Sequence, residues 1–230
     1  MFNNVIGISV DKEKSLDKSI FKTLKKAIYL STKRIFDICV GLIGVLVLIP
    51  LSIIIKILSL INKDHGNIIY AQNRIGKNGK IFKLYKFISM VPNAEAVLEE
   101  MLKDEKVRNE FEIKMKFEKD PRITKIGHFL RKTSIDELPQ LINVLKGEMS
   151  LIGNRPYLPR EKEKMGGFYN DIVKTKPGIT GYWQVKGRND ITFIDRCRLE
   201  SYYSNNMGLK MDIKIFFQTF AVVLLKKGAK

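Results

Sequence analysis

The sequence has 230 residues, of which 41 are Lys or Arg and 24 are Asp or Glu, so its formal net charge is +17. This length allows one domain with a real hydrophobic core and an appendage, and the positive charge indicates an anionic partner: nucleic acid, anionic lipid or a phosphorylated substrate. The cysteines and histidines argue against a disulfide framework and cannot form a zinc site of standard spacing; they are Cys39, Cys197, His65 and His128.

Residues 1–34 form a basic amphipathic N-terminal segment. Apolar residues recur on one face of a predicted helix and lysines lie elsewhere, a pattern typical of a helix on an anionic membrane surface. A solvated helix packed on the domain fits the same pattern. No secretory signal is predicted, because the apolar run that follows comes too late and lacks a cleavage pattern. The apolar face comprises Ile20, Leu24, Ala27 and Ile28, and the lysines are Lys22, Lys25 and Lys26.

Residues 35–62 contain an uncharged run of 18 residues from Ile38 to Ile55, with Pro50 inside it. Such a run extends about 27 Å as a helix, against about 30 Å for the apolar core of a bilayer, and a proline kinks a helix. Basic residues flank the run on both sides, whereas a spanning helix has its excess of Lys and Arg on one side. We predict a re-entrant membrane helix broken at Pro50, with a single span and a buried core helix as alternatives.

Over residues 63–230 the sequence pattern predicts an α+β domain that is mainly helical and contains a small β-hairpin. Two short strands, residues 68–73 and 81–88, flank a Gly/Asn turn. Their polar residues Lys83 and Lys86 line a site or a solvated strand face. Helical spacing follows over residues 93–117, where many charges indicate a packing or surface role.

Further along the chain, residues 120–127 predict a turn that carries Arg122 and Lys125. A short strand and a turn over residues 148–156 present Arg155, and residues 157–170 predict a helix. A glycine-rich loop over residues 176–190 carries Trp183, Gln184 and Arg188, where glycines allow a ligand to approach the backbone and an arginine offers a planar fork for phosphate. The tail, residues 211–230, predicts an amphipathic helix.

Asp136 and Glu137 form an adjacent acid pair among basic residues. Behind them an apolar stripe predicts a short amphipathic helix that ends at Lys146-Gly147; its members are Leu138, Leu141, Ile142 and Leu145. The acids therefore lie at a helix N-terminus, where Ser134 and Glu137 have the spacing of a capping box. Pro139 argues against a cap at Ser134, because it would delete a hydrogen bond inside the helix, whereas a cap at Asp136 removes the conflict. On spacing alone, the site and the capping interpretations both stay open.

An acid pair, several basic residues and a membrane anchor suit phosphoryl chemistry on a lipid acceptor. An aspartate can act as a nucleophile, and phosphates with oxygen ligands favour Mg²⁺. The sequence resembles the bacterial sugar transferase family, the monotopic polyprenyl-phosphate phosphoglycosyl transferases. The matching blocks cover nearly everything from Lys33 to Lys230 in family order: KRIFD, Pro50, RIGKNGKIFKLYKF, DPRITKIG, LRKTSIDELPQLINVLKGEMSLIGNRP, PGITGYWQVKGRN and LKKGA.

This resemblance implies a cytoplasmic catalytic domain over residues 63–230, bound to the bacterial inner membrane, that transfers a sugar 1-phosphate from a UDP-sugar to undecaprenyl phosphate and releases UMP. Asp136 would be the nucleophile beside Mg²⁺ and Glu137 its partner in catalysis and metal binding. The substrate phosphates would be bound by Arg131, Arg155, Lys86, Arg122 and Arg188. Trp183 and Gln184 would belong to the nucleotide-sugar loop, and likeness at Trp183 favours galactose or glucose over an N-acetylated amino sugar.

Three positions depart from the family pattern. Ile49 replaces the serine before Pro50, so the bend in the membrane helix loses a supporting hydroxyl. Asn154 replaces a proline beside Arg155, which predicts a looser turn. Ile88 replaces an arginine and removes one positive charge, while Lys86 remains.

The sequence thus predicts an enzyme for the first membrane step of a surface polysaccharide, such as capsule, exopolysaccharide or O-antigen, with membrane lipids and downstream glycosyltransferases as further partners. A non-catalytic basic protein bound to the membrane is the rival interpretation. It explains the charge and the anchor but leaves the acid pair without a role, and no nucleic-acid-binding motif is present, so no nucleic-acid partner is expected.

Overall fold

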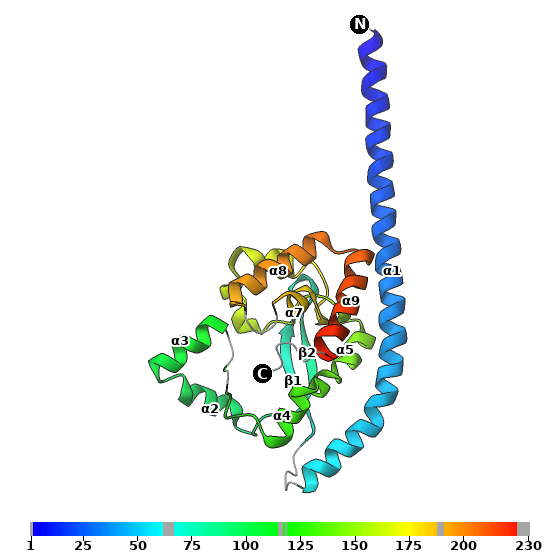
Figure 1. Cartoon of the computed structure of the whole chain (residues 1–230). Helices are drawn as coiled ribbons and strands as arrows, with labels where there is room; N and C mark the ends of the chain where they lie inside the picture. The colour runs from blue at the N-terminus through cyan, green and yellow to red at the C-terminus, as the bar shows by residue number, and fades with distance from the viewer. Residues whose placement is uncertain (1, 62–66, 115–116, 118, 188–190, 225–230) are drawn as a thin grey trace. The chain divides into compact units, whose positions relative to one another are not determined.

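A computed structural model describes residues 2–61, 67–114, 117, 119–187 and 191–224 (Figure 1). The chain divides into two compact units, Met1–Phe36 and Asp37–Lys230. One long helix, α1 (Phe2–Ile61), runs through both, and the second unit holds all the other elements. The α+β class with a mainly helical domain and one small hairpin is confirmed.

Residues 37–61 of α1 belong to the second unit and pack along its other elements. A Cβ added at Gly41 or Gly44 would collide with Leu145 or Leu141 of helix α5 (Gln140–Lys146), so both glycines allow the two helices to approach closely. Asp37 is buried, and its carboxylate accepts hydrogen bonds from the Leu151 backbone N–H at 2.9 Å and the Ser150 hydroxyl at 3.1 Å. Sequence reasoning gave Asp37 no role.

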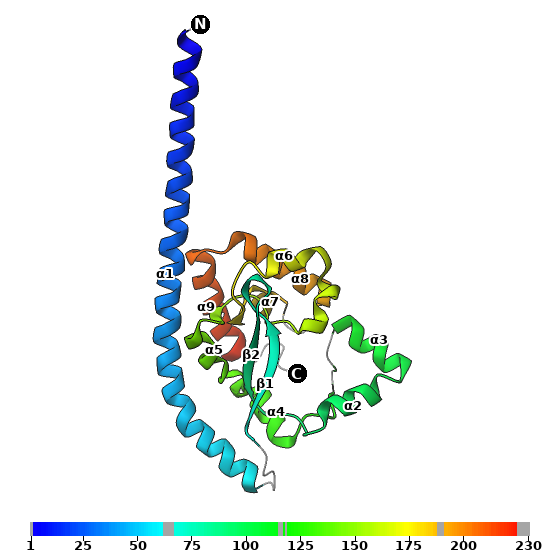
Figure 2. The same ribbon diagram turned by 180° about the vertical axis from the view of Figure 1, so that it is seen from behind.

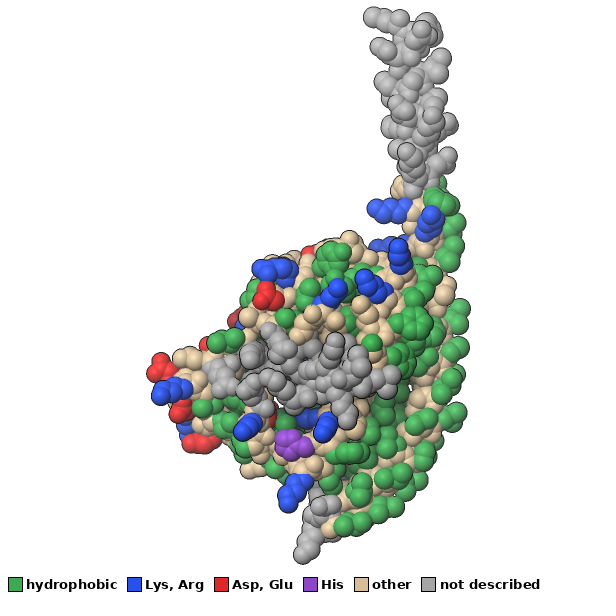
Figure 3. Space-filling model, viewed as in Figure 1, with side chains coloured by type: hydrophobic (Ala, Val, Ile, Leu, Met, Phe, Trp, Pro, Cys, Tyr) green, Lys and Arg blue, Asp and Glu red, His purple; other side chains and the backbone are tan. Residues whose placement is uncertain are grey.

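Most of the apolar surface of α1 stays uncovered. Its apolar window is long enough to cross a membrane, and only 17% of that window is buried. Figure 3 shows hydrophobic side chains along the visible face of this helix. A buried core helix does not account for that exposure, whereas association with a membrane does. Within residues 37–61, the exposed apolar side chains of α1 include Leu42, Ile43, Leu46, Val47, Ile49, Ile53, Ile54 and Ile57.

The break predicted at Pro50 is wrong as a break in the helix. The chain stays helical from Phe2 to Ile61 with Pro50 inside. Within residues 37–61, Figure 1 shows a bend between the light-blue and cyan parts of α1. A proline removes one hydrogen bond of the helical ladder and crowds one carbonyl, which bends a helix without ending it.

The predicted hairpin is confirmed. Strands β1 (Ile69–Ile75) and β2 (Ile81–Phe87) pair antiparallel, with Ile75 opposite Ile81 next to the turn. A short 3₁₀ turn, η1 (Lys77–Gly79), joins them, and Gly79 has φ of 77°, a left-handed conformation that favours glycine. Leu84 and Phe87 of β2 point into the main hydrophobic core.

The remaining elements surround this hairpin. The helical region predicted over residues 93–117 forms two helices, α2 and α3. In Figures 1 and 2 both lie on the side of the second unit opposite residues 37–61 of α1. Strands β3 and β4 form a second, parallel pair. The bounds are α2 (Ala94–Met101), α3 (Glu105–Lys114), α4 (Lys125–Lys132), η2 (Ile135–Glu137), β3 (Ser150–Ile152), η3 (Pro159–Glu161), η4 (Glu163–Phe168), α6 (Tyr169–Ile172), β4 (Gly178–Thr180), α7 (Tyr182–Lys186), α8 (Phe193–Asn206) and α9 (Leu209–Leu224).

Several local predictions change. The helix predicted over residues 157–170 consists mainly of the 3₁₀ turns η3 and η4, with a non-helical Gly166 inside η4. Part of the expected glycine-rich loop is the strand β4 and the short helix α7. The predicted C-terminal helix is confirmed as α9 up to Leu224. Helix α8 was not predicted.

Candidate active site

The acid pair lies in the 3₁₀ turn η2, between helices α4 and α5. The residue before this turn, Ser134, is left-handed with φ of 57°, and its side chain makes no cap hydrogen bond. Helix α5 begins after Pro139, also without a side-chain cap, and ends at a left-handed Gly147. The predicted end of the helix is confirmed, and both capping interpretations are wrong. A strained non-glycine residue beside two acids is typical of a functional site.

The surroundings of Asp136 and Glu137 shift the pKa values of their two carboxyl groups in opposite directions. Asp136 is 7% exposed, and burial raises its pKa to about 6, although Lys86 opposes that shift. Burial also works to raise the pKa of Glu137, but Lys86, Arg155 and Arg74 outweigh it and hold that pKa below its ordinary value. Two adjacent acids with pKa values shifted in opposite directions can take different chemical roles.

Lys86 connects the hairpin to the acid pair. It lies on strand β2, and its Nζ is 2.8 Å from Oε1 of Glu137. Both side chains are about one-third exposed, at 28% and 33%. Lys86 therefore reaches the site as predicted, but its partner in the structure is Glu137. An ammonium so placed compensates the carboxylate and adds positive charge beside Asp136.

Arg131 comes from the last turn of helix α4. Thr124 caps the start of this helix by accepting a hydrogen bond from the Gly127 N–H at 2.9 Å. Arg131 Nε donates to the Ser89 hydroxyl at 2.9 Å, and its positive charge acts to lower the pKa of Asp136. The structure thus brings Arg131 to the acid pair.

Arg122 has a structural partner. Its Nε and Nη2 donate to the two carboxylate oxygens of Asp120 at 2.8 and 2.6 Å, and this ion pair is 8% exposed on both sides. Such a two-point contact fixes the turn before α4. The phosphate contact predicted for Arg122 stays a prediction.

Arg155 follows strand β3, and its positive charge acts to lower the pKa of Glu137. Its guanidinium lies 5.9 Å from the ring of Trp183, and that of Arg196 lies 4.7 Å from the same ring. Trp183 is buried in helix α7, so it supports two arginines instead of lining an open loop. Gln184 donates to the Ile179 carbonyl at 3.2 Å.

Sequence reasoning missed three charged residues of this region. Arg74 of strand β1 donates to the Pro156 carbonyl at 3.0 Å and lies near enough to Glu137 to lower its pKa. Arg196 and Glu200 are buried on helix α8. The arginine in the hairpin block RIGKNGK was the available signal for Arg74. Arg188, a predicted phosphate ligand, lies outside the described residues.

A complete protein-only metal site is absent from the part of the chain that the structure describes, since no three His, Cys, Asp or Glu residues cluster there. Mg²⁺, however, is commonly held by one or two carboxylates together with substrate phosphates and water. Asp136 and Glu137 supply two adjacent carboxylates of that kind, so these residues fit a metal that a diphosphate substrate shares.

Taken together, an acid pair with divergent pKa values, surrounded by Lys86, Arg131 and Arg155, defines a site suited to phosphoryl chemistry. The model of the bacterial sugar transferase family matches residues 28–226, and the chain belongs to this family.

Among similar proteins, a UDP-galactose-lipid carrier transferase of Erwinia amylovora is 46% identical over 198 residues, which are 86% of this chain and 41% of that protein. An undecaprenyl-phosphate galactose phosphotransferase of Salmonella typhimurium is 45% identical over 198 residues, again 86% of this chain and 41% of that protein. The chain therefore spans about two fifths of the length of these relatives. An exopolysaccharide production protein ExoY of Sinorhizobium fredii is 38% identical over 199 residues, which are 86% of this chain and 88% of that protein.

Proposed function

We propose that this chain transfers a sugar 1-phosphate from a UDP-sugar to undecaprenyl phosphate and releases UMP, as the first membrane step of a surface polysaccharide. The observation that carries the proposal is the buried Asp136, whose pKa near 6 leaves it ionised at neutral pH beside Lys86 and Arg131. An ionised carboxylate that burial destabilises is a better nucleophile than a solvated one.

In the proposed reaction, a carboxylate oxygen of Asp136 attacks the phosphorus that carries the sugar. The bond from that phosphorus to the bridging oxygen breaks, and UMP leaves with the electron pair. An oxygen of undecaprenyl phosphate then attacks the same phosphorus, which forms the lipid diphosphate and returns the Asp136 carboxylate. Splitting one displacement into two steps in this way is the logic of covalent catalysis.

The surrounding residues have distinct roles in this proposal. Arg131 and Arg155 bind the diphosphate oxygens, and Lys86 holds Glu137 in place through their 2.8 Å ion pair. Mg²⁺ held by Asp136 and Glu137 together with the substrate would neutralise charge on the diphosphate.

The donor sugar we propose is a hexose, galactose or glucose, because two of the relatives are named for galactose. The membrane we propose is the bacterial inner membrane, with the site on its cytoplasmic face, where UDP-sugars are made. The exposed apolar side chains of α1 between residues 37 and 61 supply the anchor. We propose a re-entrant arrangement in which α1 bends near Pro50 without breaking, because basic residues flank the run on both sides.

The test is a substrate panel. The purified full chain is mixed with undecaprenyl phosphate and, in turn, with UDP-galactose, UDP-glucose, UDP-N-acetylglucosamine or UDP-N-acetylgalactosamine, and UMP is measured. We expect lipid-dependent UMP release with UDP-galactose or UDP-glucose and none from the Asp136→Asn variant. Preference for an acetylated sugar would correct the donor alone. A folded wild-type protein that releases no UMP from any donor would leave the non-catalytic binding protein as the better account.

A further inference from the structure

The turn that carries Arg155 makes hydrogen bonds with other elements at three consecutive residues. Asn154 precedes it, Arg155 is bound through its own backbone, and Pro156 follows. Each contact comes from a different part of the second unit, so together they fix the direction in which the Arg155 side chain leaves the backbone.

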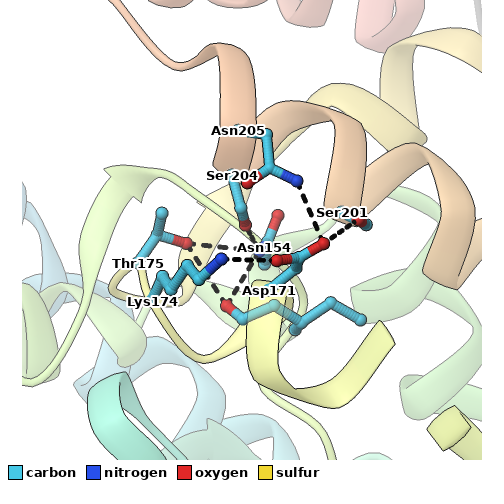
Figure 4. A network of polar contacts seen from close by, with 8 residues as sticks. Asn154, Asp171, Lys174, Thr175, Ser201, Ser204 and Asn205 are labelled. Carbon is cyan, nitrogen blue, oxygen red and sulfur yellow. Dashed lines mark hydrogen bonds and ion pairs between the residues drawn. The ribbon is translucent and has the colours of Figure 1, made fainter. Parts of the chain in front are cut away.

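The Asn154 side chain fastens the start of the turn (Figure 4). Its Nδ2, which carries two hydrogens, lies within hydrogen-bond distance of three acceptors: the Ile172 carbonyl at 3.0 Å, the Thr175 hydroxyl at 3.2 Å and the Ser204 hydroxyl at 2.6 Å. Asn154 is 3% exposed, so these bonds form away from water, where losing a partner costs most. Because a carbonyl can only accept, the contact with Ile172 fixes which end of the amide is the nitrogen.

The looser turn expected at Asn154 stays a prediction, but the structure shows attachments that a proline side chain could not make. A proline would fix one backbone angle, but the asparagine ties the turn to the ends of helices α6 and α8 instead. The backbone carbonyl of Asn154 also accepts a hydrogen bond from the Gly178 N–H at 2.8 Å, which joins the turn to strand β4. The side-chain amide of Asn154 thus attaches the turn to other elements, where a proline ring would restrict only the local backbone.

Glu200 holds the next residue. Its Oε1 accepts a hydrogen bond from the Arg155 backbone N–H at 2.6 Å, and Glu200 is 1% exposed. At the far side Arg74 donates to the Pro156 carbonyl at 3.0 Å. The backbone of the turn is thus bound immediately before, at and after Arg155.

The guanidinium that this turn presents is not fully used by the protein. Among the described residues, the buried Nε atoms of Arg74, Arg155 and Arg196 have no hydrogen-bond partner. The Asn154 Oδ1 and Glu200 Oε2 acceptors beside them also have no partner among these residues. Buried polar atoms without partners are rare and costly, so the protein does not complete its own hydrogen bonds around Arg155. A turn held by hydrogen bonds on both sides of an arginine whose Nε has no protein partner is the arrangement expected of a preorganised anion contact.

We infer that Asn154 and Glu200 are positioning residues that hold Arg155 in place for the diphosphate of the nucleotide donor. This inference rests on the proposed function for its ligand, a nucleoside diphosphate sugar. Neither residue touches the substrate; both act through Arg155, and their loss misplaces its guanidinium.

The test is a double-mutant cycle with Asn154→Ala, Arg155→Ala and the double variant, compared with the wild-type full chain. Two quantities are measured: kcat/KM for the UDP-sugar and Kd for UDP, which needs no turnover. We expect Asn154→Ala to lower kcat/KM and UDP affinity about tenfold or more, since small misplacements of binding groups have such effects. In the Arg155→Ala background, the same change should have less than about a twofold effect, because residues that act through one another are not additive.

Matched variants separate positioning from general damage. Asn205→Ala is the control: it lies next to Ser204 on α8 and bonds Asp171 at 3.0 Å, but it does not touch the turn, so activity should stay near wild type. Ser204→Ala removes the 2.6 Å contact between Asn154 and the Ser204 hydroxyl, and it replaces Asn154→Ala in the cycle if that variant does not fold. Glu200→Gln keeps an acceptor for the Arg155 N–H and should retain activity that Glu200→Ala loses. This exchange is mild because burial raises the pKa of Glu200 to about 7.

Independent, additive losses in the cycle would overturn the inference, as would a folded Asn154→Ala variant with wild-type kcat/KM and UDP affinity. The proposed function fails in a different way: the wild type would release no UMP from any donor. The Kd for UDP still tests the positioning role in that case. UDP affinity that depends on Asn154 only when Arg155 is present would support the inference.

Discussion

Replacing the acid Asp136 with its neutral isostere should stabilise the protein while it abolishes activity. Asp136 has a folded pKa of about 6 against an ordinary value of 3.8, because burial disfavours its charge. A difference of about two pKa units corresponds to about 3 kcal/mol of unfolding free energy at neutral pH, as an upper bound. Asp136→Asn removes the charge and should recover up to this amount. Activity should fall by orders of magnitude, because an amide is a poor nucleophile.

The pH dependence of this gain has a defined sign. A carboxyl group whose folded pKa is raised contributes stability that is complete below pH 4 and is lost as the pH rises through about 6. The advantage of Asp136→Asn over the wild type should therefore be absent below pH 4, about half developed at pH 5 and complete by about pH 7.5. The effect comes from burial of the Asp136 charge and should therefore be seen in the protein without substrate.

The assay is thermal unfolding of the full chain, followed by the fluorescence of its one tryptophan, Trp183, which is 7% exposed. For a chain of this size, a gain of about 3 kcal/mol corresponds to a rise in Tm on the order of 10 °C. Glu137→Gln is the matched control. Its carboxylate is favoured by Lys86 and has a lowered pKa, so this variant should be less stable at neutral pH. Unchanged or lower stability of Asp136→Asn at pH 7.5 would refute the electrostatic reasoning.

Three further predictions concern acidity, metal and topology. The rate of UMP release should rise with pH through about 6 as Asp136 ionises, and a rate that is flat between pH 5 and 8 would separate its ionisation from catalysis. Excess chelator should abolish turnover and Mg²⁺ restore it, with Mn²⁺ partly effective and Ca²⁺ poor; full activity in chelator would remove the metal from the mechanism. Single cysteines at Asn4 and Asn67 should both resist an impermeant reagent in intact cells, and labelling of either one would exclude the re-entrant arrangement.

The sequence alone was sufficient for the parts of the fold that follow simple periodicity. Alternating residues on both sides of a Gly/Asn turn predicted the β1–β2 hairpin, and the apolar stripe before Gly147 predicted helix α5 and its end. The acid pair was found because adjacent carboxylates among basic residues are unusual. These features depend on local spacing, which a sequence displays directly.

Helix α8 shows why the rest could not be predicted. Its buried face includes Arg196 and Glu200 between Phe193 and Tyr203, so charged residues interrupt the apolar pattern that marks a helix. Those charges are buried because they serve the Arg155 turn and Trp183, partners that are distant in the sequence.

The capping interpretation failed for a related reason. Spacing alone cannot distinguish a capped helix from a 3₁₀ turn whose first residue, Ser134, is left-handed. Only the folded backbone shows that neither Ser134 nor Asp136 caps helix α5.

Intact-protein mass spectrometry after incubation with UDP-sugar, without lipid acceptor, tests the central claim most directly. The account predicts a gain of one sugar-phosphate group per chain, located at Asp136 by fragmentation, with at most one equivalent of UMP released and the adduct discharged when undecaprenyl phosphate is added. Asp136→Asn should show neither adduct nor UMP. An adduct at another residue, or lipid-dependent turnover by Asp136→Asn at a near-normal rate, would contradict the proposed mechanism.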